Sequence, residues 1–246
     1  MLSEAVKGLN RLRNSAILSL AASLFSLPLT AFSPFRGLGT ATEDVVALFA
    51  VLIWVLVFGL LLLALMLAAW VLKVLGWWSL CKSGMRRFYC VTRYAVLLGP
   101  IIGVSLLLFG GVALVFEALS RGVLANGELG EMQEGTVLLY VLPGLLVMTI
   151  ASVIEGVSAL DVGLLTGVKS LTLGAVTYLI ASLLQPLQLP TAALGSKELA
   201  SGVASGLNWA SSAASLLASL LFAVGFHRAK GRVIQSEAQR EAVGAA

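Results

Sequence analysis

The stretch VVALFAVLIWVLVFGLLLLALMLAAWVL, residues 45–72, decides the fold of this chain. It runs for 28 residues without a single Asp, Glu, Lys or Arg. A helix needs roughly 20 apolar residues to cross the ~30 Å hydrocarbon core of a bilayer, so this stretch is long enough. An isolated strand would leave backbone groups unpaired in lipid, and a membrane barrel would need short segments of alternating polarity. Residues 45–72 are therefore predicted to form a transmembrane helix.

Five further stretches on either side of it also lack charged residues. Only 11% of the 246 residues are charged and the mean hydropathy is +1.00, whereas soluble domains carry about 25% charged residues. The sequence therefore predicts an all-α, polytopic membrane protein that forms a single integral membrane domain over residues 1–246. Its six predicted transmembrane helices cover residues 14–35, 45–72, 94–116, 135–154, 170–189 and 207–226.

The basic residues are distributed unevenly between the two sides of this six-helix arrangement. Six crossings put both termini on one side, and that side receives 13 of the 16 Lys and Arg residues, all but Arg36, Arg121 and Lys197. Positive charge in short loops favours the cytoplasm, so both termini are predicted to be cytoplasmic in a multi-pass protein of the cell membrane. These basic residues face anionic lipid and account for the net charge of +4. Membrane lipids are therefore expected as partners, and nucleic acid is not.

The segment KVLGWWSLCKSGMRRFYCVTR, residues 73–93, has the pattern of an amphipathic helix. Its apolar residues recur at i, i+3 and i+4, with basic residues on the opposite face. We expect residues 74–92 to lie along the cytoplasmic interface, where Lys82, Arg86 and Arg87 are candidate contacts for anionic lipid. Cys81 and Cys90 have the wrong spacing for a zinc knuckle, and a reducing cytoplasm makes a disulfide between them unexpected.

The sequence carries few groups that could support catalysis or bind a metal. His227 is the single histidine, which excludes a bis-histidine haem or a His-rich metal site from this chain alone. No nucleotide-binding or hydrolase motif is present, so we expect neither an enzyme nor a cofactor or metal. Glu155 and Asp161 are the best candidates for a transport site, although the simpler interpretation places both at the interface. Residues 155–169 are interpreted as a short cytoplasmic connection, with a re-entrant segment as the alternative.

Small residues recur along the predicted spans and indicate close contacts between helices or with another subunit. These candidate packing residues are Gly99, Gly103, Gly202, Gly206, Ser211, Ser215 and Ser219. The fifth span adds several polar residues, among them Gln185, so any water path is expected along the fifth and sixth spans.

Two stretches resemble small, uncharacterised polytopic membrane proteins of archaeal thermophiles. These are GLNRLRNSAILSLAASL, residues 8–24, and GPIIGVSLLLFGGVAL, residues 99–114. The resemblance lies in the pattern and implies no activity or functional residue.

Two functional hypotheses follow from the sequence. The first is a non-catalytic accessory or scaffolding subunit that packs against other membrane subunits or a second copy of itself. The alternative is a transporter or channel for small solutes with a weakly polar path, for which a cavity bounded by Gln185, Ser211 and Ser215 would be evidence.

Overall fold

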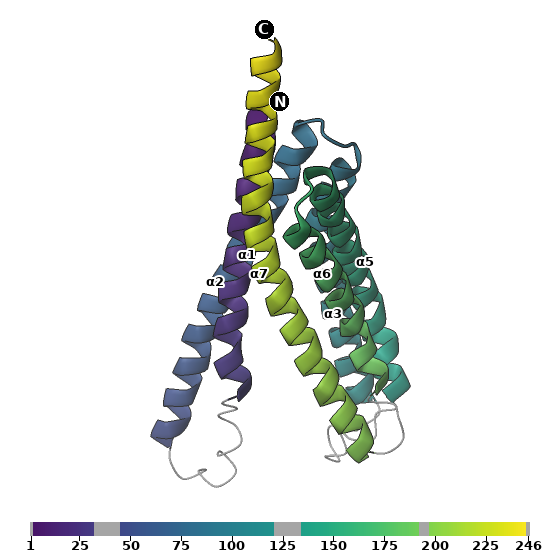
Figure 1. Ribbon diagram of the computed structural model, residues 1–246. Helices are drawn as coiled ribbons and strands as arrows, with labels where there is room; N and C mark the ends of the chain where they lie inside the picture. The colour runs from purple at the N-terminus through teal and green to yellow at the C-terminus, as the bar shows by residue number, and fades with distance from the viewer. Residues whose placement is uncertain (1, 32–44, 121–133, 192–196, 245–246) are drawn as a thin grey trace.

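The computed structural model describes residues 2–31, 45–120, 134–191 and 197–244 (Figure 1). Within these ranges the chain is helical apart from two tight turns. The six helices are α1 (Leu2–Ala31), α2 (Val45–Lys82), α3 (Phe88–Ser120), α5 (Glu134–Thr166), α6 (Lys169–Thr191) and α7 (Lys197–Gly244).

Four of these helices contain a segment that is long and apolar enough to cross a membrane. The segments are Leu56–Lys82 in α2, Phe88–Glu117 in α3, Leu139–Thr166 in α5 and Trp209–Gln239 in α7. Helix α6 adds a shorter apolar stretch, Lys169–Leu184. Large apolar side chains on α2, such as Leu60, Leu63 and Leu67, are exposed. Such surfaces suit lipid tails rather than water, so the chain is a multi-pass helical membrane protein.

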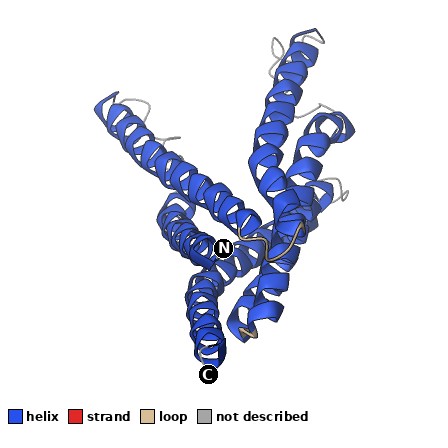
Figure 2. Cartoon of the chain, turned by 90° about the horizontal axis from the view of Figure 1, so that it is seen from above, coloured by secondary structure: helices blue, strands red, loops and turns tan. Residues whose placement is uncertain are grey.

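The helices form a closed ring in the order α1, α2, α3, α5, α6, α7 and back to α1, and α5 also touches α7. Both termini and both tight turns lie at one end, which we call the closed end (Figure 1). Away from it the helices spread apart, as the view in Figure 2 also shows. Helix α7 extends beyond the closed end beside the start of α1 (Figure 1).

The two turns of the closed end each depend on a glycine with a positive φ angle. Gly84 (φ 71°) lies in the turn between α2 and α3, and Gly167 (φ 65°) lies in the turn between α5 and α6. L-residues with a side chain rarely adopt this conformation, so glycine permits the abrupt end of each helix.

These turns correct two expectations about the connections. The predicted interfacial helix over residues 74–92 is wrong as one element, because α2 ends at Lys82 and α3 begins at Phe88. Similarly, α5 continues through Asp161 to Thr166, so neither a connection nor a re-entrant segment begins at Glu155. In both places the polar residues continue a long helix instead of ending it.

Most of the large buried side chains lie toward the closed end. Leu9 and Leu12 of α1 pack in one cluster with Trp77 and Leu80 of α2 and with Leu171 of α6. The spacing of the α1 residues follows the i, i+3, i+4 pattern of a single helix face. This cluster fixes the relative positions of helices that diverge further along.

The structure also overturns the expectation of free thiols. Cys81 and Cys90 form a disulfide, with their Cα atoms 4.8 Å apart. The turn at Gly84 folds the start of α3 back onto the end of α2, which brings the two cysteines within bonding range. The local geometry therefore brings together two cysteines that the sequence alone had left unpaired.

Candidate functional site

A largely buried ion pair lies inside the ring, with the Lys73 side chain 26% exposed and that of Glu155 10% exposed. The Nζ atom of Lys73 on α2 lies 3.2 Å from each carboxylate oxygen of Glu155 on α5. The hydroxyl of Tyr178 on α6 donates a hydrogen bond of 3.0 Å to Glu155 Oε2. The Lys73 ammonium also lies 5.8 Å from the centre of the Tyr178 ring, within reach of a cation–π interaction. Three helices therefore contribute one side chain each to this central cluster, which comprises Lys73, Glu155 and Tyr178.

The central cluster joins helices that are not neighbours in the ring, since α2 and α5 are separated by α3 on one side. Along the helix axes, Glu155 lies about 9 Å from Asp161, and Lys73 and Tyr178 lie about 14 Å from Lys82 and Lys169, respectively. The cluster is therefore set back from the charged residues of the closed end. Charges at such a depth are expensive and commonly mark a functional site, although an ion pair can also simply hold helices together.

Two small cavities adjoin the central cluster, and all three of its side chains line both. The larger has a volume of about 180 Å³ and is bordered by serines of α1 and α7, including Ser15, Ser19, Ser215 and Ser219. The smaller, of about 100 Å³, is lined mainly by apolar residues of α2, α3 and α5. The ion pair thus lies between a cavity that serines border in part and a smaller, mainly apolar one.

Trp77 provides an unused hydrogen-bond donor beside the larger cavity. Its side chain lines this cavity and is 1% exposed. The indole Nε1 is buried and has no hydrogen-bond partner among the described residues. Because buried donors are nearly always paired, an acceptor such as water or a solute oxygen is expected here.

A second polar group lies closer to the end of the bundle. The hydroxyl of Tyr89 donates to Asp161 Oδ2 at 2.9 Å, and Arg86 Nε lies 3.7 Å from the same oxygen. Thr92 and Ser158 hydrogen-bond to each other one turn deeper. These contacts tie α3 to α5, and Asp161 is partnered rather than free for transport.

The serine stripe of α7 divides between packing and cavity. Ser211 is buried, whereas Ser215 and Ser219 line the larger cavity. The side chain of Gln185 lies outside the described residues. Of the two described residues that were expected to bound a water path, Ser215 lines the cavity and Ser211 does not.

The glycines of α3 sit in a tight crossing with α5. A Cβ atom added to Gly99 would lie 2.3 Å from Ala151 Cβ, and one added to Gly103 would lie 2.3 Å from Met148 Cγ. Such spacing admits glycine alone. Gly206 has no described atom within 4 Å of an added Cβ, and the surroundings of Gly202 lie outside what the structure describes.

The basic residues expected to contact lipid have different surroundings. Lys82 lies 5.8 Å from the centre of the Trp78 ring, and Arg86 pairs with Asp161. Arg87 is exposed. Lipid contact by all three stays a prediction.

The central cluster is the feature that sequence reasoning missed. The sequence marked Glu155 as a candidate for a transport site. It placed Lys73 just after the predicted span 45–72 and Tyr178 within the predicted span 170–189, and it gave neither residue a role. Nothing in the sequence pairs residues 82 positions apart. Glu155 and Asp161 share a helix six positions apart, yet each has its own cation.

The fold and the central cluster together define a polytopic helical membrane protein with a buried ion pair. Comparison with protein-family models, with curated proteins and with solved structures found no match. Among the described residues, no group of three His, Cys, Asp or Glu side chains could hold a metal ion.

Proposed function

We propose that this protein is a transporter or channel for small polar solutes, and that the central cluster with its serine-lined cavity is the solute site. The observation that carries the proposal is the buried Lys73–Glu155 pair between two cavities. A polar solute can insert between the two side chains, so that its acceptor binds the Lys73 ammonium and its donor binds the Glu155 carboxylate. The unpartnered Trp77 indole adds a donor for a solute oxygen. A volume of about 180 Å³ suits solutes smaller than typical drug-sized ligands.

We further infer that all six helices cross the membrane and that both termini are cytoplasmic. The closed end collects both termini and both turns (Figure 1), and with them most of the basic residues. Reporter fusions at Glu131 and at the C-terminus test this arrangement. We expect the two reporters to lie on opposite sides of the membrane. Reporters on the same side would contradict six crossings.

Solute flux through reconstituted protein tests the transport proposal. The full chain is placed in phosphatidylcholine liposomes, and swelling in isosmotic glycine, urea or glycerol is followed by light scattering. We expect swelling to be faster than in protein-free liposomes for at least one solute. The double variant Lys73→Met/Glu155→Met should return this rate to background while it keeps the helical circular dichroism spectrum.

A matched control is available on α1. Glu4 and Lys7 form an exposed ion pair with the same 3.2 Å separation, so Glu4→Met/Lys7→Met removes equal charge away from the cavity. This control should swell like the parent. Background rates for the parent in all three solutes, or parental rates for the Lys73/Glu155 variant, would contradict the proposal.

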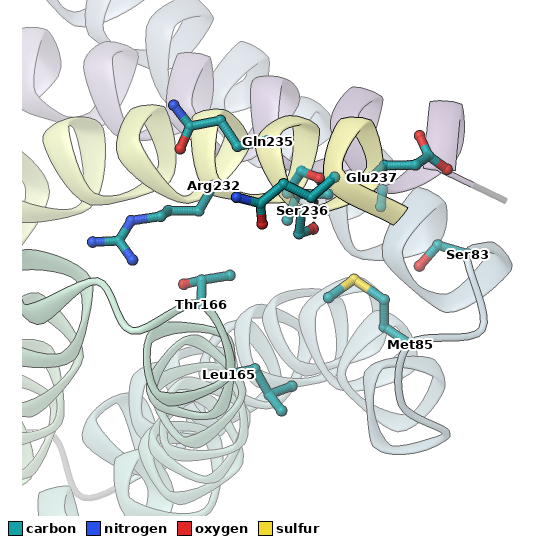
Figure 3. A pocket seen from close by; sticks show the side chains of 11 residues that line it. Ser83, Met85, Leu165, Thr166, Arg232, Gln235, Ser236 and Glu237 are labelled. Carbon is teal, nitrogen blue, oxygen red and sulfur yellow. Dashed lines mark hydrogen bonds between the residues drawn. The ribbon is translucent and has the colours of Figure 1, made fainter. Parts of the chain in front are cut away.

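A second candidate function is the accessory or scaffolding subunit, favoured by the protruding end of α7. Beside this extension lies a hollow of about 850 Å³, bordered by Ser83, Met85 and Thr166 and by Gln235 and Ser236 of α7 (Figure 3). An open hollow of this size and mixed polarity at the closed end suits a partner protein. Purification in a mild detergent tests this role, because a stable larger complex is expected, and a lone 25.7 kDa species would contradict it.

A further inference from the structure

A second cavity at the closed end has an unusual concentration of positive charge. It lies where the turn between α5 and α6 meets α7 and has a volume of about 440 Å³. Three of its lining residues are basic, Lys169, Arg228 and Arg232, and Gln235 is a further polar one. No carboxylate lines it in the part of the chain that the structure describes.

The packing of α6 on α7 brings these three cations together. A Cβ atom at Gly225 would lie 2.8 Å from Leu171 Cα, so the two backbones nearly touch just below the cavity. Arg228 and Arg232 follow on α7 at an i, i+4 spacing, which puts them on one helix face. Lys169 is the first residue of α6. Figure 3 shows Arg232 extending from α7 toward the end of α5 near Thr166.

The three basic side chains have no anionic partner within the described chain. All are exposed, and the ion pairs at this end of the described bundle involve other residues, Lys7 with Glu4 and Arg86 with Asp161. Like charges that converge on one cavity repel one another unless an anion is bound among them. The site is therefore built for an anionic group.

The position of the cavity along the helices identifies the source of this anion. The charge-free run of α7 ends at Phe226 and that of α6 begins at Ser170, so the cavity lies where the apolar layer meets the polar one. Lipid headgroups occupy this depth, and basic pockets between transmembrane helices on the cytoplasmic side bind acidic headgroups. We propose that Lys169, Arg228 and Arg232 bind the phosphate of an anionic membrane lipid. This site is independent of the transport proposal.

Lipid-dependent stabilisation tests this proposal. The full chain in neutral detergent is titrated with dioleoyl phosphatidylglycerol, and binding is followed through the rise in Tm. The variant Lys169→Gln/Arg228→Gln/Arg232→Gln should bind about a hundredfold more weakly, since each cation near the membrane surface contributes about fivefold. The variant Arg228→Lys/Arg232→Lys keeps the charge and should stay within about fivefold of the parent.

Two controls test the specificity of the cavity and of its ligand. The variant Lys7→Gln/Arg11→Gln/Arg13→Gln loses the same charge on α1 outside the cavity, and should bind the lipid as the parent does. Dioleoyl phosphatidylcholine and inorganic phosphate should leave Tm unchanged. Equal weakening by both triple variants would overturn the proposal in favour of general attraction. Stabilisation by inorganic phosphate alone would overturn the lipid as the ligand.

Discussion

The two ends of the helix ring are held together by different interactions. At the closed end, side chains from different helices are paired by hydrogen bonds, ion pairs and a disulfide, as in the contact of Arg11 with Ser79 at 2.8 Å. Toward the other end, the described part of α2 presents residues such as Leu63 and Met66 outward. Lipid tails are as apolar as leucine, so they give these helices little reason to associate. Specific contacts must therefore set the structure at the closed end.

The largest effect is expected from splitting the central ion pair. Lys73→Met leaves the Glu155 carboxylate without its cation in a site where it is 10% exposed. Breaking one partner of a buried pair typically costs about 3–5 kcal/mol, and replacing both with apolar residues is often neutral. We expect a loss of that size in the free energy of unfolding in detergent for the single variant.

The double variant Lys73→Met/Glu155→Met is the control for this prediction. Its stability should return close to that of the parent, because no unpaired charge remains. A double variant as unstable as the single one would show that the pair acts through contacts other than charge.

The next largest difference is expected between two leucines of the same helix. Leu80 is fully buried and Leu63 is 54% exposed. Leu80→Ala should cost about 2–5 kcal/mol through the cavity it leaves. Leu63→Ala exchanges one lipid-facing apolar side chain for another and should cost little. Thermal unfolding of both variants checks this contrast. Equal losses of stability in the two variants would contradict it.

The disulfide should contribute an intermediate amount. Closing the short loop between Cys81 and Cys90 is worth about 3 kcal/mol in the chain-entropy estimate. Cys81→Ser/Cys90→Ser should lower Tm accordingly, and mild reduction of the parent should reproduce the loss. Alkylation of the protein in intact membranes, followed by mass spectrometry, measures how much of it carries the bond. Fully alkylated cysteines without prior reduction would contradict the pairing.

The smallest effect concerns two glycines of α7. A Cβ atom at Gly225 would meet the Leu171 backbone, whereas Gly231 has open space. Gly225→Ala should cost about 1–3 kcal/mol by overpacking. Gly231→Ala should be neutral or stabilise by up to about 1 kcal/mol, because alanine favours helix. Chemical denaturation measures the free energy of unfolding of both variants. Equal stability of the two would contradict the close approach of α6 and α7 at Gly225.

The sequence was a good guide to the helices and a poor guide to what joins them. Charge-free runs predict apolar helices because the cost of a charge in lipid is large and local. The helix ends were harder to predict, because α2 continues past Lys73 and α5 continues past Asp161, so neither charged residue marked the end of its helix. The glycines with positive φ, Gly84 and Gly167, are the physical stops, and both are visible in the sequence as glycines near a helix end.

The site depended on relations that the sequence pattern does not contain. Lys73 and Glu155 lie on helices that are not ring neighbours, so neither spacing nor periodicity relates them. The sequence shows that Ser211, Ser215 and Ser219 form a face of small residues on one helix. It does not show what this face contacts. Only the splay of the helices decides that Ser215 and Ser219 meet a cavity whereas Ser211 is buried.

The accessibility of Ser215 to water tests the solute site most directly. In the parent, Cys81 and Cys90 are paired, so Ser215→Cys introduces one reactive thiol. The modification rate by a charged, membrane-impermeant methanethiosulfonate is measured in proteoliposomes, with the exposed Leu63→Cys as the lipid-facing reference. We predict that Ser215→Cys reacts at least tenfold faster than this reference and that added Lys73→Met/Glu155→Met changes the rate. A Ser215→Cys thiol as unreactive as that of Leu63→Cys would contradict a water-filled site at the centre of the ring.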